Sequence, residues 1–132
     1  MIGIIDVSAS VDILLEKGKF KLFHKVLHDV SSLTAPDMYI PELTNTLWKL
    51  NKLKTLTNEE CMGFIQKGIK LVDKFIDCKD LWQEAFSAGL NNKHSVYDMF
   101  YMITARRSGG VLITTDSVLA AICKKNHVEV CY

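Results

Sequence analysis

The chain has 132 residues and a mass of 14.9 kDa, with 48% hydrophobic and 23% charged residues. This is the size and composition of one globular domain, so we expect residues 1–132 to form a single domain. Sixteen basic residues against fifteen acidic ones give a net charge of +1, which excludes a uniformly basic nucleic-acid binder.

The start of the chain and its cysteines both indicate a cytoplasmic protein. The apolar run after Met1 ends at Asp6 without preceding basic residues, so it does not have the form of an export signal. No apolar stretch approaches the ~18 residues of a membrane helix. No two cysteines have the Cys-x-x-Cys spacing of a redox or zinc site. We therefore expect four reduced thiols and no membrane partner.

Strand-like and helix-like segments alternate along the chain. Short apolar, β-branched runs predict strands, and apolar residues at helical spacing predict helices. The expected strands are 2–5, 38–40, 71–76, 111–114 and 128–131. The expected helices lie around 11–15, at 19–31, from Pro41 through Leu50, after the capping-box pattern Thr57-x-x-Glu60, and at 81–90, 95–107 and 117–125. This alternation predicts an α/β fold with a parallel sheet of four to five strands and helices on both faces.

Acidic residues recur where these strands end, at the edge of a parallel sheet where functional sites lie. Asp6 directly follows the first strand, Glu42 the second and Asp116 the fourth, while Asp98 begins the helix before strand 111–114. Each acid alone is compatible with a helix N-terminus stabilised by the macrodipole. Four acids in one cleft repel one another, and such a cluster persists only with a bound cation or with protonation. Oxygen ligands without His or Cys favour Mg²⁺ or Mn²⁺ over zinc.

Four short motifs follow one another in the order found in a known family. They are Ile4-Ile5-Asp6-Val7-Ser8, Ile40-Pro41-Glu42-Leu43-x-Asn45, Ser95-Val96-Tyr97-Asp98-Met99-x-Tyr101 and Leu112-Ile113-Thr114-x-Asp116. Together they resemble the PIN domains, most closely the VapC-type toxins of toxin–antitoxin pairs, over the whole chain. The resemblance implies a three-layer α/β/α fold, an Mg²⁺- or Mn²⁺-dependent ribonuclease that cleaves RNA, a homodimer, and an antitoxin that blocks the site.

The resemblance also implies roles for single residues. Asp6, Glu42, Asp98 and Asp116 stand at the acidic positions of the family. We expect Asp6 and Asp98 to bind the metal directly, and Asp116 to hold a metal-bound water or a second metal. Glu42 would orient the attacking water. The supporting polar positions are Ser8, Asn45, Ser95 and Thr114. Many relatives carry a further acid just after the last Asp, whereas this chain continues with Ser117-Val118-Leu119.

Other site chemistries are less well matched. A haloacid-dehalogenase phosphatase needs Asp-x-Asp, where this chain has Asp6-Val7-Ser8. A response-regulator receiver needs an acceptor Asp after its central strand and a late Lys, and a serine hydrolase needs a His partner for Ser8; neither pattern is evident. His24 and His28 have the i, i+4 spacing of metal ligands but no accompanying Glu. The main alternative is a non-catalytic PIN-like module that binds RNA or a protein.

Two surface features are expected from composition along the helices. An RNA substrate requires cations around an acidic centre. Separately, the early helices carry more apolar side chains than one helix layer needs, and this excess predicts a homodimer interface. The candidate cations are Lys17, Lys19, Lys49, Lys52, Lys93, Arg106 and Arg107. The apolar set is Phe20, Phe23, Leu27, Leu47, Trp48, Leu50 and Leu53.

Overall fold

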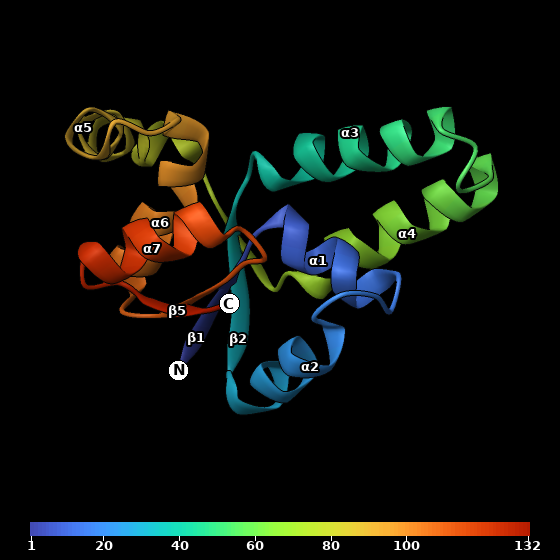
Figure 1. The fold of residues 1–132 in the computed structure, drawn as a ribbon, viewed down its shortest axis with the longest axis horizontal. Helices are drawn as coiled ribbons and strands as arrows, with labels where there is room; N and C mark the ends of the chain where they lie inside the picture. The colour runs from blue at the N-terminus through green and yellow to red at the C-terminus, as the bar shows by residue number, and fades with distance from the viewer.

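The computed structural model describes residues 1–132 as one five-stranded parallel sheet with seven α-helices around it (Figure 1). The α/β class and the parallel sheet of four to five strands are therefore confirmed. The strands are β1 (Ile2–Ile5), β2 (Ser32–Pro36), β3 (Lys74–Ile76), β4 (Val111–Ile113) and β5 (Glu129–Cys131). The helices are α1 (Val7–Leu14), α2 (Phe20–Asp29), α3 (Tyr39–Lys52), α4 (Asn58–Leu71), α5 (Trp82–Asn92), α6 (Val96–Ser108) and α7 (Ser117–Lys125), with a 3₁₀ turn at Cys78–Asp80.

The strand order is β3-β2-β1-β4-β5. Strands β2 and β3 are added on one side of β1, and β4 and β5 are then added on its other side. The reversal lies between β1 and β4, which pair in parallel with Ile5 opposite Ile113. Loops that follow these two strands diverge to opposite faces, and the space between them is where ligands bind in open parallel sheets. The next residues in the chain, Asp6 and Thr114, lie side by side at this switch point.

The helices form one layer on each face of the sheet (Figure 1). Helices α1 to α4 lie on one side, and α5, α6 and α7 lie on the other, with α6 packed against β1, β2 and β4. A hydrophobic cluster of 27 buried residues fills the space between the layers and includes Ile4, Ile5, Leu112 and Ile113 at no exposure. No helix combines the length and the apolar composition that crossing a membrane requires.

The second strand is not where the sequence predicts it. Residues 38–40 were expected to form a strand, but Tyr39 begins α3, and the strand is Ser32–Pro36 instead. Leu33 and Ala35 are buried there between β1 and β3, so tertiary burial makes this segment a strand although it lacks a β-branched run. Tyr39 is also buried, and its hydroxyl donates to the Gly68 carbonyl and accepts from Ser10 Oγ, each at 2.9 Å.

Several other expected elements are confirmed. Strand 2–5 and helix 117–125 have the predicted bounds, and Thr57 and Glu60 form the capping box that begins α4. Helix α6 ends at Gly109, whose φ of 61° suits a residue without a side chain. The expected strand 71–76 shortens to Lys74–Ile76, because α4 continues to Leu71 and Val72 is its C-cap.

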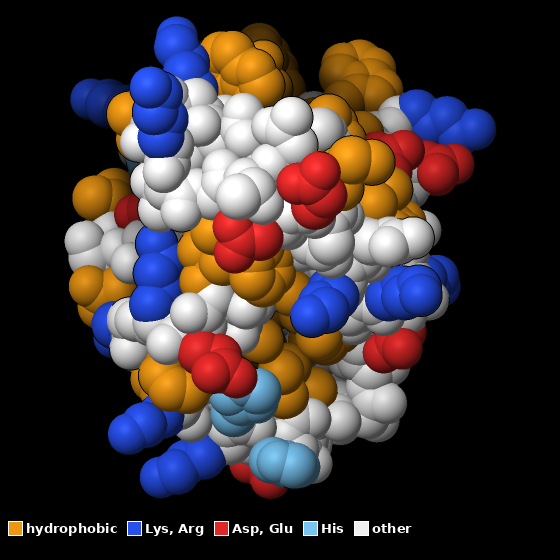
Figure 2. All heavy atoms as spheres, turned by 90° about the vertical axis from the view of Figure 1, so that its right-hand side faces the viewer, with side chains coloured by type: hydrophobic (Ala, Val, Ile, Leu, Met, Phe, Trp, Pro, Cys, Tyr) orange, Lys and Arg blue, Asp and Glu red, His pale blue; other side chains and the backbone are white.

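The apolar set of the early helices divides between core and surface. Phe23 and Leu47 are fully enclosed, whereas Trp48 is 56% exposed and Leu53 is 74% exposed. Figure 2 views the molecule from the side of α3 and α4 and shows apolar side chains between scattered acidic and basic ones, with no field of a single charge. The exposed apolar residues of this helical arm are Trp48, Leu53 and Met62.

Candidate active site

All four predicted acids lie at helix N-termini. Asp6 is the N-cap of α1 and Asp116 is the N-cap of α7. Glu42 and Asp98 lie in the first turns of α3 and α6. Each helix N-terminus carries roughly half a positive charge, which offsets part of the repulsion among the carboxylates.

The Asp6 carboxylate is the most enclosed of the four, with 7% of the residue exposed. Its Oδ1 accepts hydrogen bonds from Ser8 Oγ at 2.6 Å and from the Ala9 amide at 2.9 Å. Its Oδ2 accepts a hydrogen bond from Thr114 Oγ1, which joins the end of β4 to the end of β1. A carboxylate has about four acceptor positions, so three bonds leave Asp6 about one lone pair, on Oδ2.

Ser8 and Thr114 continue this network to the loop after β4. Ser8 Oγ accepts from the Thr115 amide at 3.1 Å, and Thr114 Oγ1 accepts from the Asp116 amide at 3.0 Å. The Asp116 side chain turns to its own helix, where Oδ1 accepts from the Val118 and Leu119 amides at 2.9 and 3.1 Å. Asp116 is thus connected to Asp6 through Thr114, and its visible role is that of a helix cap.

Glu42 is held from the opposite helix layer. Its Oε1 accepts a hydrogen bond from the Tyr101 hydroxyl at 3.0 Å, across 59 residues of sequence, which links α3 to α6 over the end of the sheet. Tyr101 is only 2% exposed, and burial together with the Glu42 carboxylate raises the pKa of its phenol. The phenol therefore stays a donor, and it leaves the second Glu42 oxygen, Oε2, without a partner.

Asp98 pairs with a histidine that the sequence reasoning did not include. Its Oδ2 lies 2.7 Å from His94 Nε2, at i, i+4 spacing across the start of α6. About a third of the Asp98 side chain is exposed, and its Oδ1 has no hydrogen-bond partner within the chain. Asp98 therefore has one oxygen fixed by His94 and one oxygen free.

Three of the four acids share one electrostatic environment. Burial raises the pKa of the Asp6 carboxyl above its usual range, and the charge of Asp98 raises it further. Burial also raises the pKa of the Glu42 carboxyl, and the charges of Asp6 and Asp98 add to that effect. No lysine or arginine forms an ion pair with any of the four acids.

A buried thiol faces the same charges. Cys123 of α7 is fully enclosed, and burial raises its pKa to about 12, with further contributions from Asp6 and Asp98. A thiol with so high a pKa stays protonated and unreactive near neutral pH. Cys123 therefore serves as packing beneath the acids and is no candidate nucleophile.

The supporting residues expected from sequence divide into two groups. Ser8 and Thr114 bond to the Asp6 carboxylate. Asn45 is exposed and lines a cleft of about 440 Å³ together with Glu42, Met38, Pro41 and Tyr97. Ser95 is the N-cap residue of α6 but is exposed, and its hydroxyl makes no capping bond. The structure thus brings Ser8, Thr114 and Asn45 to the acids and leaves Ser95 outside their contacts.

Two of the expected rim cations are already engaged elsewhere. Arg106 Nη2 lies 3.3 Å from Glu84 Oε2, and Arg107 Nε donates to Glu84 Oε1 at 2.8 Å. These contacts join the end of α6 to α5 and lie about two helical turns beyond Asp98. His24 and His28 are on α2, where the ring of His24 packs edge-on against Phe20, 6.1 Å between centroids.

The donor set fits a hard divalent cation in kind. It consists of carboxylate oxygens. The carboxylates of Asp6, Glu42 and Asp98 interact through their negative charges, and no lysine or arginine neutralises them. No group of three or more His, Cys, Asp or Glu side chains is already drawn together as a closed metal site. Free oxygens nevertheless remain on Asp98 and Glu42, and one lone pair remains on Asp6.

Sequence reasoning missed the partners that orient the acids. Tyr101 appears in a recognised motif without an assigned role, and no sequence pattern points to its contact with Glu42. The His94 contact carries a weak signal, since His94 precedes Asp98 by four residues and such pairs meet on one helical face.

Comparison with known proteins agrees with the fold of the chain. No family model matches the sequence. Ribonuclease VapC3 of Pyrobaculum aerophilum is 24% identical over 119 residues, which cover 89% of this chain and 91% of that protein. The crystal structure of PAE2754 from Pyrobaculum aerophilum superposes with a TM-score of 0.73 at 22% identity, covering 92% of this chain and 87% of the other.

A second solved structure extends the likeness to nearly the full length. It is VapBC2 from Rickettsia felis, bound to a DNA fragment from the promoter of its genes. The TM-score is 0.70 at 12% identity, covering 99% of this chain and 98% of the matched chain. The resemblance indicated by the four motifs is confirmed: the chain has the PIN-like fold, and among known proteins it is similar to the VapC-type PIN domains.

Proposed function

We propose that this chain is a metal-dependent ribonuclease that hydrolyses RNA phosphodiester bonds and acts as the toxin of a toxin–antitoxin pair. The observation that carries the proposal is the placement of Asp6, Glu42 and Asp98. They come from three helix N-termini at the switch point of the sheet, interact through their charges, and have no cationic side chain beside them. The likeness to Ribonuclease VapC3 supports the same activity.

The proposed cofactor is Mg²⁺ or Mn²⁺, with Asp6 and Asp98 as its direct protein ligands. When bound, such an ion lowers the pKa of a coordinated water and offsets charge on the phosphate under attack. Ser8 and Thr114 orient the Asp6 carboxylate and favour its ionised form against the effect of burial, because each donates a hydrogen bond to it. The second oxygen of Asp116 makes no hydrogen bond within the chain and would accept one from a water of the ion, while Oδ1 caps α7.

Glu42 and Asn45 are placed to act on the substrate side. Both line the cleft of about 440 Å³, and the Tyr101 bond holds the Glu42 carboxylate at its inner edge. The unbonded Glu42 oxygen accepts a proton or a hydrogen bond from the attacking water. Asn45 and the exposed ring of Tyr97 face the same cleft, where a single-stranded substrate would lie.

A fluorogenic RNA assay tests this function. Purified protein should cleave the RNA in millimolar Mn²⁺ or Mg²⁺ and should not cleave it in EDTA. Asp98→Asn should remove the activity, whereas Glu59→Gln should keep it, because Glu59 is an exposed acid in the first turn of a different helix, α4. RNA binding without cleavage under every metal condition would instead support the alternative, a non-catalytic PIN-like binding module.

The proposed protein partner is a cognate antitoxin, as the name VapBC2 indicates for the Rickettsia felis complex. A segment of the antitoxin with an Arg or Lys would satisfy the free oxygens of Asp98 and Glu42, because a guanidinium forms strong bonds with carboxylates. Co-expression with the adjacent reading frame should yield a complex without ribonuclease activity. Full activity of the purified complex would refute inhibition by that chain.

A homodimer is proposed through the arm formed by α3 and α4. Trp48, Leu53 and Met62 are more than half exposed on this arm, and Trp48 and Met62 border a groove of about 340 Å³. Large apolar side chains clustered in this way are typical of interfaces. Light scattering at ~100 µM should give twice the chain mass, and Trp48→Glu should shift it to the monomer. A monomeric wild type would contradict the proposal.

The cytoplasmic location stays a prediction.

A further inference from the structure

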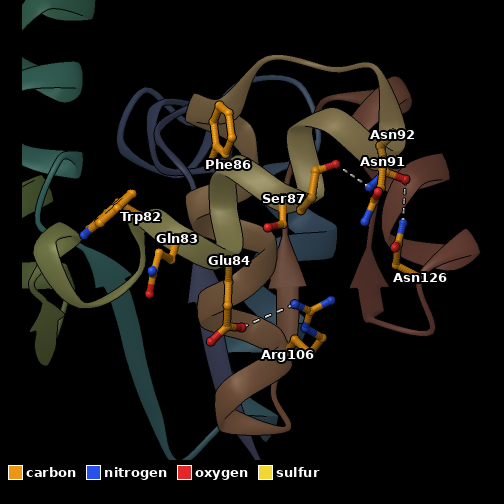
Figure 3. Close-up of a pocket in the computed structure, with 10 residues that line it drawn as sticks. Trp82, Gln83, Glu84, Phe86, Ser87, Asn91, Asn92, Arg106 and Asn126 are labelled. Atoms are coloured by element: carbon orange, nitrogen blue, oxygen red, sulfur yellow. Dashed lines mark hydrogen bonds and ion pairs between the residues drawn. The ribbon is translucent and has the colours of Figure 1, made fainter.

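The largest pocket of the molecule is separate from the acids. It has a volume of about 490 Å³ and lies along α5, between the C-terminal parts of α6 and α7 (Figure 3). Trp82 and Phe86 stand at one end of it, and Asn91, Asn92 and Asn126 stand at the other, with the Glu84–Arg106 pair lower in the view. Nothing in the proposed chemistry at the sheet edge uses this pocket.

The aromatic end of the pocket is open to solvent. Trp82 is 56% exposed and Phe86 is 55% exposed, and they are four residues apart on one helix. Residues four apart lie on neighbouring turns of the same helix face, and both rings line the pocket. An aromatic ring with a free face offers a platform on which a nucleobase stacks, whatever its identity.

The rest of the lining is polar and unsatisfied in part. The side-chain amides of Gln83 and Asn91 make no hydrogen bond within the chain, and both residues are exposed. Asn126 Nδ2 donates to Asn92 Oδ1 at 2.9 Å and to the Ile122 carbonyl. The side-chain oxygen of Asn126, Oδ1, makes no hydrogen bond within the chain. Free amides offer a donor and an acceptor side by side, as needed to pair with the edge of a base.

The charges beside the pocket suit a nucleotide chain. Glu84 binds both Arg106 and Arg107, so one carboxylate faces two guanidinium groups and the cluster keeps one net positive charge. The bonds from Arg107 and Arg106 lower the pKa of the Glu84 carboxyl, which keeps the cluster ionised. A net positive rim next to a neutral amide pocket matches a phosphate next to an uncharged base.

We propose that the pocket between Trp82, Phe86, Asn91 and Asn126 binds one nucleobase of single-stranded RNA. The inference rests on the proposed function, in which RNA is the substrate, and it assigns a subsite to that substrate. The pocket and the acids share helix α6: Arg106 follows Asp98 by eight residues, a rise of about 12 Å. A strand that passes the acids therefore reaches the pocket within a short length. An apolar protein segment is the competing occupant, and the mixed aromatic and amide lining favours the base.

A fluorescence titration with single-stranded RNA tests the subsite directly. The chain has two tryptophans, so Trp48→Phe leaves Trp82 as the only indole reporter, and Asp98→Asn prevents cleavage during the measurement. Homopolymers of A, C and U of about ten nucleotides serve as probes in Mg²⁺. Stacking should quench the Trp82 emission. In a separate binding titration with fluorescein-labelled RNA, Trp82→Ala should weaken binding about 5- to 150-fold.

Matched variants separate stacking from general effects. Trp82→Phe should retain most of the affinity because it keeps an aromatic face, and Asn91→Ala should change the relative affinity for A, C and U. Leu90→Ala should bind like the parent, since Leu90 is 64% exposed on α5 but does not line the pocket. An RNA with abasic sites should lose the Trp82-dependent part of its affinity. Thermal melting of Trp82→Ala confirms that the variant is folded.

The outcomes distinguish this inference from the proposed function. If Trp82→Ala and Phe86→Ala both bind RNA like the parent while the wild type cleaves RNA with Mn²⁺, the subsite is refuted and the ribonuclease stands. If abasic RNA binds as tightly as intact RNA, the pocket does not hold a base. If Trp82→Ala and Phe86→Ala lose binding to the co-encoded protein partner but keep the RNA affinity of the parent, the pocket is a protein-docking site. Trp82-dependent RNA binding without any cleavage would refute the ribonuclease and keep the base subsite.

Discussion

The four acids fall into two pairs that are built differently. Asp6 and Asp116 follow the central strands and cap helices α1 and α7, where each accepts hydrogen bonds from backbone amides of its own helix. Glu42 and Asp98 lie inside the first turns of α3 and α6, and each is held through a single side-chain oxygen, by Tyr101 and His94 respectively. The first pair is part of the frame of the fold. The second pair has more carboxylate oxygens that make no hydrogen bond within the chain.

The difference separates two uses of the same residue type. An acid that caps a helix by accepting from its backbone amides contributes to stability whether or not a ligand binds. An acid with an unpaired oxygen near other acids adds repulsion until a cation arrives. Substitutions should therefore divide along the same line: in the first pair they should lower stability as well as RNA cleavage, and in the second pair they should lower RNA cleavage with little loss of stability.

The largest expected effect is on RNA cleavage by Asp98→Asn. The amide keeps the size of the side chain, and its oxygen still accepts a bond from His94, but the charge and a metal ligand are lost. Cleavage should fall by about 100-fold or more, since even partners behind metal ligands account for 10- to 100-fold. The melting temperature in EDTA should stay the same or rise. The fluorogenic RNA assay and a thermal melt measure both quantities.

Metal addition provides the matching control. Mg²⁺ at ten times its Kd should stabilise the wild type by about 1.4 kcal/mol and the variant much less. For a domain of this size that is a rise in Tm of roughly 3–8 °C. A variant that cuts RNA at the wild-type rate would show that Asp98 is no ligand.

Asp6→Ala should have the largest effect on stability. It leaves the Ala9 amide and the hydroxyls of Ser8 and Thr114 without their acceptor, at about 1–3 kcal/mol for a buried group left unsatisfied. Removing a buried charge works in the opposite direction, because burial raises the pKa of this carboxyl. We expect the unpaired donors to dominate, with a net loss of about 2 kcal/mol in urea unfolding at pH 7. An unchanged midpoint would mean that the Asp6 network does not support the fold.

The sequence indicated Asp6 and Asp116 because each stands next to a strongly patterned segment. The apolar runs 2–5 and 111–113 are buried on both faces, so the residues after them had to lie at the edge of the sheet. Helix 117–125 has its own cap and apolar face, which made its bounds predictable from local residues alone. Local chemistry was sufficient wherever one segment contained its own signals.

Features that depend on distant residues were not predictable. Strand β2 (Ser32–Pro36) has no distinctive composition, and it is a strand because β1 and β3 pair with it on either side. The bond between Tyr101 and Glu42 spans 59 residues and exists only once both helix layers are in place. Ser95 stands at the start of α6 as expected, but its side chain makes no hydrogen bond there that would support the acids.

A pair of variants at Asp116 should separate capping from catalysis. Asp116→Ala removes the acceptor of two amides and should cost about 1 kcal/mol of stability, as N-cap losses do. Asp116→Asn keeps a good capping residue and removes only the charge, so its stability should be close to that of the wild type. If Asp116 holds a water of the cation, Asp116→Asn should still lose activity. Wild-type activity in Asp116→Asn would make this residue a cap alone.

The smallest expected effect is a gain in stability from Glu42→Gln. The glutamine oxygen still accepts the Tyr101 bond, so the substitution removes the charge and little else.

Burial and the charges of Asp6 and Asp98 raise the pKa of Glu42 in the folded protein, which means that folding disfavours its ionised form. A raised folded pKa makes the wild type relatively more stable at low pH, where the group is protonated, and this advantage disappears as the pH rises through the folded pKa. Glu42→Gln should therefore be more stable than the wild type at pH 7, and the difference should shrink as the pH falls toward the ordinary glutamate range. Urea unfolding of both proteins at several pH values measures it, with Glu59→Gln as an exposed control. A difference that grows at low pH would show that Glu42 is stabilised by its charge, contrary to the crowding of acids at this site.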